Sequence, residues 1–204
     1  GIYKSNDFGQ SFVQVASETE LPGVVFSLIA LKNGSILAGS NQGVYQSTDQ
    51  AMSWKLLFTP NIEENINALV VNPNNEQQLF AAQIKTGIYQ SNDGGQNWQL
   101  LPPPFSPWYI HDLTFKPENS THLLASSNQG IYQSIDGATS WQLLQQVKAM
   151  KLQFSLINDN FVFAAAFDKG LYKSVDGGQS WIAINSSFDK IPVMLSIYML
   201  PTGR

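Results

Sequence analysis

One seven-residue pattern recurs five times in this chain of 204 residues and constrains its fold more than any other feature. Each copy reads Gly, an aliphatic residue, Tyr, Gln or Lys, Ser, any residue and Asp, and an aromatic residue follows five positions later. The copies begin at Gly1, Gly43, Gly87, Gly130 and Gly170. Their aspartates lie 42, 44, 43 and 40 residues apart, which is the repeat length of a four-stranded propeller blade.

Each repeat also contains four short apolar runs separated by turns. In the repeat at 66–101 they are 66–71, 79–83, 88–91 and 98–101. Four strands of this length suit one antiparallel sheet, and no run has the 3.6-residue apolar period of a helix. Runs that are apolar at neighbouring positions, such as 161–166, indicate a sheet that is covered on both faces.

The sequence therefore predicts a single all-β domain over residues 1–204, a β-propeller of four-stranded antiparallel blades. Complete blades are expected at 24–57, 66–101, 110–144 and 151–184. Residues 1–16 supply a third and a fourth strand and residues 193–200 a first strand, so joining the two ends in one split blade would remove exposed sheet edges. We expect five blades, with six to eight as the alternative. Because no run after 200 can serve as the second strand of the split blade, we expect a native chain that extends past one end, or a piece of a larger propeller.

Composition argues against several classes of function. Only 13% of the residues are charged, the net charge is -4 and the pI is near 5.0, so no basic stripe is available for nucleic acid. No apolar run approaches the roughly 20 residues of a membrane-spanning helix, and no membrane insertion is expected. Without cysteine, and with His111 and His122 in different turns, neither a thiolate nor a zinc cluster can form. No metal or cofactor is expected.

The Ser and Asp of each copy have a structural task in the turn between the third and fourth strands. Asp93 can accept bonds from backbone N–H groups about two residues on, while Ser91 bonds within the same turn. Glycine supplies a left-handed backbone in three copies, but Ala51 and Ala138 replace it in two, so those turns should be strained or differently shaped. The closing aromatic, Trp in four copies and Phe12 in the first, should bury its ring against neighbouring strands.

The motif Ser-x-Asp-x-Gly-x-Ser/Thr-Trp resembles the Asp-box, or bacterial neuraminidase repeat. From end to end the chain is similar to Asp-box β-propellers of the sialidase-like and sortilin-like superfamily, which occur in sialidases, xyloglucan-cleaving glycoside hydrolases, sortilin-type receptors and photosystem II assembly factors. The resemblance implies an extracytoplasmic or secreted location and a structural role for every box. The residues assigned to folding are Ser5, Asp7, Ser47, Asp49, Ser91, Asp93, Ser134, Asp136, Ser174 and Asp176.

If the boxes lie on one face, strand alternation puts the connections between blades, and those between second and third strands, on the other. This loop face is the candidate site. Its most irregular loop, 102–109, carries Trp108 and Tyr109, which suit a sugar or a protein partner, although packing over the neighbouring blade is the alternative. The candidate ligand- or partner-binding residues are Trp108, Tyr109, His111, Asp112, Glu63, Glu64 and Asp168. No catalytic residue is assigned.

We expect a non-enzymatic binding or scaffolding propeller, a monomer or part of a longer chain, that recognises a protein or a glycan through the loop face. The alternative is a glycoside hydrolase with two loop-face carboxylates. Its acids would come from Glu18, Glu20, Glu63, Glu64, Asp112, Asp168 and Asp189. A sialidase needs three arginines to clamp the substrate carboxylate, whereas this chain has one, Arg204. The photosystem assembly factors resemble propellers with an arginine patch, which is missing here.

Overall fold

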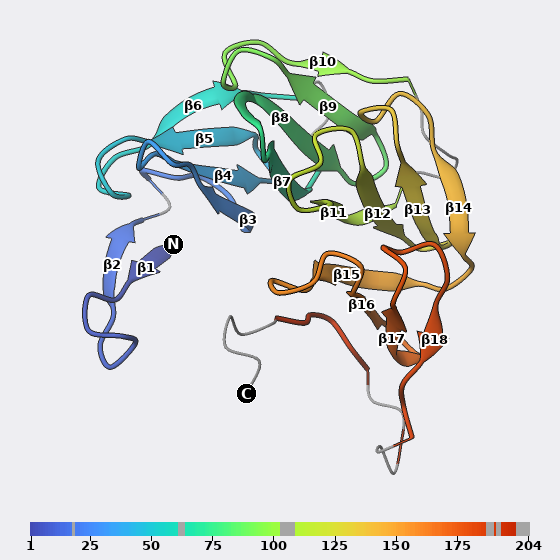
Figure 1. Ribbon diagram of the computed structural model, residues 1–204. Coiled ribbons are helices and arrows are strands. Elements are labelled where there is room, and N and C mark those ends of the chain that lie inside the picture. The colour runs from blue at the N-terminus through green and yellow to red at the C-terminus, as the bar shows by residue number, and fades with distance from the viewer. Residues whose placement is uncertain (18, 61–63, 103–108, 187–189, 191–192, 199–204) are drawn as a thin grey trace. The chain divides into compact units, whose positions relative to one another are not determined.

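The computed structural model describes residues 1–17, 19–60, 64–102, 109–186, 190 and 193–198. Within these residues the chain forms strands and turns, and no helix long and apolar enough to cross a membrane occurs among them. The chain divides into two compact units. Figure 1 labels the strands of both units. Unit 1 consists of Gly1–Val71 and Glu76–Leu100, and unit 2 of Asn72–Asn75 and Leu101–Arg204.

Unit 1 contains a two-stranded sheet followed by two four-stranded sheets. The small sheet pairs β1 (Ile2–Lys4) with β2 (Val13–Ala16). The second sheet consists of β3 (Val25–Ala30), β4 (Ile36–Ser40), β5 (Val44–Ser47) and β6 (Lys55–Phe58). The third consists of β7 (Ile66–Asn72), β8 (Asn75–Gln83), β9 (Gly87–Ser91) and β10 (Gln99–Leu100). In both larger sheets each strand lies beside the next one in the chain.

Unit 2 contains two four-stranded antiparallel sheets with the same order. The first consists of β11 (Ile110–Phe115), β12 (Leu123–Ser127), β13 (Ile131–Ser134) and β14 (Gln142–Gln145). The second consists of β15 (Ala149–Phe154), β16 (Val162–Ala166), β17 (Gly170–Ser174) and β18 (Ile182–Ala183). All five residues of β12 are buried, which confirms that a sheet in this chain is covered on both faces.

The predicted fold class is confirmed: the protein is an all-β propeller, and the four expected complete blades are four-stranded sheets. The predicted split blade is present only as β1 and β2, because the described residues 193–198 form no strand. That segment is fixed by a bond from Met194 N to Phe167 O (3.3 Å). A strand needs a partner strand, and no described strand pairs with this segment. The count of five blades stays a prediction.

Every Asp-box closes its hairpin with the same hydrogen bonds. Ser91 Oγ donates to Asp93 Oδ1 (2.8 Å) and accepts from Gly95 N (2.8 Å). The carboxylate of Asp93 accepts from Asn97 N (2.9 Å) and from the Asn97 amide (2.7 Å), four residues on and not two as the sequence suggested. The corresponding bonds recur in the boxes of Asp7, Asp49, Asp136 and Asp176. The residue before the aromatic is thus a third side chain of the turn.

The two boxes with alanine keep this hydrogen-bonded shape and are strained in the backbone. Ala51 has φ of 74° and Ala138 has φ of 73°, in the left-handed region that disfavours a side chain. Ala51 N and Ala138 N donate to the Oγ of their box serine at 2.8 and 2.9 Å, as the glycine N–H groups do in the other boxes. Of the two outcomes expected for these turns, strain is the one observed.

Two of the aromatic residues that end a box, Trp98 and Trp181, pack on the preceding sheet. Trp181 is 9% exposed and lies in one apolar cluster with Leu124 of β12, and Trp98 stacks on Phe58 of β6 with ring centroids 5.5 Å apart. The indole N–H groups of Trp54, Trp98 and Trp181 donate to the carbonyl three residues earlier. Phe12 is 63% exposed, so the prediction that it is buried is wrong. No described sheet precedes β1 in the chain to cover its ring.

The box glycines offer a direct test of this packing. Gly178 has φ of 98°, and a Cβ there would lie 2.9 Å from Leu124 Cδ1, whereas a Cβ on Gly137, with φ of 71°, meets nothing within 4 Å. Gly137→Ala should cost about 1 kcal/mol of unfolding free energy through backbone strain alone, and Gly178→Ala about 3 kcal/mol because overpacking adds to it. Urea denaturation of both variants measures the difference. Equal losses would mean that the turn does not press on the preceding sheet.

Candidate binding site on the loop face

In unit 2 the loops at the strand ends opposite the Asp-boxes surround a cleft of about 590 Å³. Its walls come from the β12–β13 turn, the β14–β15 connection and the β16–β17 turn, all of which the sequence placed on the loop face. Among its lining side chains are Asn128, Tyr132, Lys148, Asp168, Lys169 and Tyr172. The cleft therefore combines two tyrosines and amide groups with two ammonium groups and a carboxylate.

The loops around the cleft are held by hydrogen bonds of their own. Asn185 Oδ1 accepts from Leu171 N (2.7 Å), and the Asn185 amide donates to Lys169 O (2.7 Å), which ties the β16–β17 turn to the end of β18. The Lys148 ammonium lies 4.1 Å from the centroid of the Phe167 ring, a cation–π distance. These contacts give the cleft a fixed wall before any ligand arrives, which lowers the entropy cost of binding.

His111 lies next to the cleft and orients one of its amides. The His111 Nε2–H donates to Asn128 Oδ1 (2.6 Å). Burial lowers the pKa of His111 below its ordinary value of 6.5, the hydrogen bond to Asn128 opposes that shift, and the charge of Lys148 adds to it. The lowered pKa favours the neutral imidazole, and the hydrogen bond engages the carbonyl oxygen of the Asn128 amide.

The placement of Asp112 on the loop face is wrong. Asp112 lies in β11, and the residue is only 2% exposed. Its carboxylate accepts from Lys151 Nζ (2.8 Å) and from Leu152 N (3.0 Å), so it joins β11 to β15 of the next sheet. Burial raises the pKa of Asp112, and the Lys151 charge opposes the rise. Ser27 has the same task in unit 1, since its Oγ donates to Ile66 O (3.1 Å).

Both residues follow a β-bulge in the first strand of their sheet. The bulges lie between Val25 and Ser27, between Ile110 and Asp112 and between Ala149 and Lys151. A bulge adds one residue and turns the next side chain in a new direction. The sequence does not predict these bulges, because the apolar pattern of the strands is compatible with regular strands.

The other predicted site residues are dispersed. Tyr109 is half-buried, and its carbonyl accepts from Asn128 N (3.3 Å) beside the cleft. Glu64 lies in unit 1 and pairs with Lys85 (2.8 Å). Trp108 and Glu63 lie outside the described residues. Of the seven candidates, Asp168 alone is in the described lining of the cleft.

Sequence reasoning missed Lys148, Lys169, Tyr132 and Tyr172. The two tyrosines belong to the repeated pattern and were given no role of their own, although their strands begin at the loop face. The described part of the chain contains no group of three or more His, Asp or Glu side chains that could hold a metal ion.

The model of the Sortilin-Vps10 family, described as "Sortilin, neurotensin receptor 3", matches residues 42–156, more than half of the chain. The chain belongs to this family. The resemblance inferred from the Asp-boxes is thereby confirmed. No curated protein matches the sequence.

Solved structures of propellers are similar to this Sortilin-Vps10 chain. An ancestral GH74 enzyme is 25% identical with a TM-score of 0.71, and the match covers 82% of this chain and 25% of the enzyme. The GH74 enzyme of Niastella koreensis is 20% identical with a TM-score of 0.74, and the match covers 93% of this chain and 35% of the enzyme. YCF48 bound to D1 peptide is 24% identical with a TM-score of 0.64, and the match covers 88% of this chain and 59% of YCF48. The chain thus spans about a quarter to three fifths of these proteins.

The ion pair of the buried Asp112 with Lys151 generates a testable expectation. Lys151→Met should leave Asp112 buried without its cation and lower the unfolding free energy by about 2 kcal/mol near pH 7. Because the raised folded pKa favours the protonated acid, this variant should regain stability as the pH falls from 7 toward 4.

Denaturant unfolding at both pH values measures the effect. Lys116→Met is the matched control, because its partner Asp159 is 48% exposed and the pair is worth less than about 1 kcal/mol. Equal losses in the two variants at pH 7 would contradict the role given to Asp112.

Proposed function

We propose that the chain is a non-enzymatic binding propeller that recognises a protein or a glycan through its loop face. The observation that carries this proposal is the unit 2 cleft, where Lys148 and Lys169 flank the tyrosines with Asp168 as the single carboxylate in the described lining. Of the two partner classes, this charge balance favours a peptide segment that carries a carboxylate. A neutral glycan would leave the two ammonium groups without a charged partner.

Each group of the cleft has a task in peptide binding. An ammonium group forms charge-assisted hydrogen bonds with a carboxylate, which are about twice as strong as neutral ones. Side-chain amides such as those of Asn128 and Gln129 pair with peptide N–H and C=O groups. The rings of Tyr132 and Tyr172 provide flat apolar surface with a polar tip. The YCF48 propeller solved with a peptide supports this choice at the level of the fold.

The second candidate, a glycoside hydrolase, is favoured by the GH74 neighbours. Such an enzyme places two carboxyl groups roughly 5 to 10 Å apart. Asp168 has no second carboxylate beside it in the described lining of the cleft, and Asp112 is already engaged by Lys151 and Leu152. These observations favour binding over hydrolysis.

The test uses the full chain and a peptide array in which each acidic peptide is paired with its amide form. An acidic peptide should bind, its amide should bind about tenfold more weakly, and Lys169→Ala should weaken the acidic peptide by a similar factor. Lys85→Ala is the control, because it removes an exposed lysine from unit 1. Release of reducing sugar from xyloglucan that Asp168→Asn abolishes would establish the hydrolase instead.

A further inference from the structure

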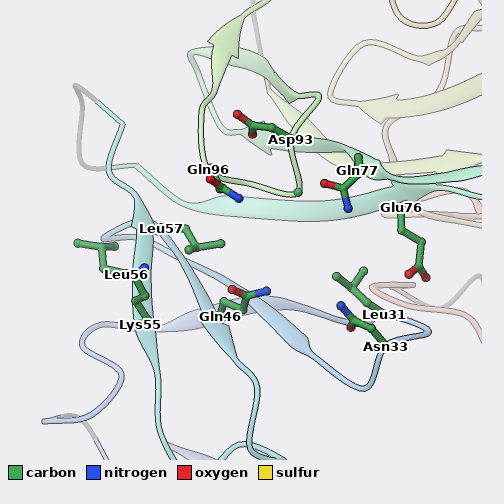
Figure 2. Close-up of a pocket in the computed structure, with 11 residues that line it drawn as sticks. Leu31, Asn33, Gln46, Lys55, Leu56, Leu57, Glu76, Gln77, Asp93 and Gln96 are labelled. Carbon is green, nitrogen blue, oxygen red and sulfur yellow. The ribbon is translucent and has the colours of Figure 1, made fainter.

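A second cleft, of about 540 Å³, lies in unit 1 on the Asp-box side of the strands, between the sheet β3–β6 and the sheet β7–β10. Leu31 and Asn33 line it from the turn after β3, and Glu76 and Gln77 from β8. Figure 2 shows Glu76 directed toward Leu31 and Asn33, with the Gln77 amide and the Asp93 turn close by. This cleft belongs to neither the loop face nor the site proposed above.

Unit 2 has positions equivalent to those of this cleft in its own two sheets, and backbone hydrogen bonds identify them. Leu31 N donates to Ser35 O (2.8 Å) and Lys116 N donates to His122 O (2.9 Å), which places Lys116 where unit 1 has Leu31. In the next sheet of each unit, Gly94 N donates to Gln77 O (2.9 Å), and Gly177 N to Asn160 O (2.8 Å). Asp159, which precedes Asn160, therefore corresponds to Glu76, which precedes Gln77.

The two units differ in the side chains at these positions. In unit 2 the Lys116 ammonium crosses to the next sheet, pairs with Asp159 Oδ2 (3.3 Å) and lies 3.5 Å from the place of a Cβ on Gly177. In unit 1 the equivalent residue, Leu31, has a buried apolar side chain, so no ammonium group is present at this position. The acidic residue is present in both units, as Glu76 in unit 1 and Asp159 in unit 2. One carboxylate oxygen of Glu76 accepts a hydrogen bond from Lys32 N (2.7 Å). The acidic half of the pair is thus present in unit 1 without the lysine.

We propose that the unit 1 cleft binds an alkylammonium group from outside the chain, such as a lysine side chain of a partner peptide or a free diamine. The group takes the position that the Lys116 ammonium holds in unit 2. Glu76 supplies the charge, and Asn33 and Gln77 line the cleft beside it. Asp93 adds a second negative charge while its oxygens stay engaged in the box turn.

One group in the lining opposes this occupant. Lys55 of β6 is exposed, lines the same cleft and forms no ion pair with Glu76. Its charge lowers the affinity for a second cation. Replacing it with Gln should therefore strengthen binding severalfold.

The test follows backbone amide shifts of the isotope-labelled full chain by NMR. The probes are cadaverine, the peptide acetyl-Gly-Lys-Gly-amide and the same peptide acetylated at the lysine Nζ. We expect saturable shifts at Gly94 and Gln77 with both amines and none with the acetylated peptide. Tighter binding of the peptide would indicate a protein partner, and tighter binding of cadaverine a small amine. No shifts with either amine, or equal shifts with the acetylated peptide, would overturn the proposal.

Variants then locate the site. Glu76→Gln should weaken binding at least about tenfold, and Leu31→Lys should abolish it by supplying the missing ammonium. Lys116→Leu should open the unit 2 counterpart and add shifts at Gly177. Glu64→Gln removes a carboxylate from the other end of the strands and should change nothing. Undiminished amine binding by Glu76→Gln would overturn the proposal, and this outcome does not depend on whether Leu31→Lys folds. Peptide binding at the loop face is a separate property that neither variant tests.

Discussion

The hydrogen bonds of the box serine and aspartate are the interaction on which the rest of this structure depends. They fix the turn between the third and fourth strands, and this turn fixes the position of the aromatic residue that follows it. In unit 2 this places Gly178 and Trp181 against Leu124 of the preceding sheet. One polar turn thus sets both a pair of strands and the packing of one blade on another. A chain with few charges and no cysteine can build a regular core in this way.

Differences between the repeats give each candidate site of the molecule its own chemistry. The position after the bulge is a short hydroxyl in one blade, Ser27, and a buried carboxylate in another, Asp112. The turn after the first strand carries Leu31 in unit 1, where a cleft is open, and Lys116 in unit 2, where an ion pair with Asp159 is formed. The frame is constant because the boxes hold it, so single side chains can change the chemistry at its ends.

Much of the fold could be predicted from the sequence, because the box has a fixed spacing and each copy supports the others. Strand alternation also assigned Asp168 to the loop face, where it lines the cleft. Asp112 could not be placed, since the bulge at Ile110 to Asp112 turns it into the interior. Phe12 was misjudged because the repeat predicts burial against a preceding sheet, and the described residues contain no sheet before β1. Lys148 and Lys169 were missed because a cleft is formed by residues far apart in the chain.

The most direct test of the account is an NMR titration of the aspartate carboxyl groups. Hydrogen bonds from the residue before the aromatic and from the box serine lower the pKa of Asp7, Asp49, Asp93, Asp136 and Asp176 from an ordinary 3.8 to about 2. The account predicts that all five titrate near 2 and that unfolding in urea returns them to their ordinary range. Midpoints near 3.8 in the folded protein would show that the carboxylates do not hold the turns, and would contradict it.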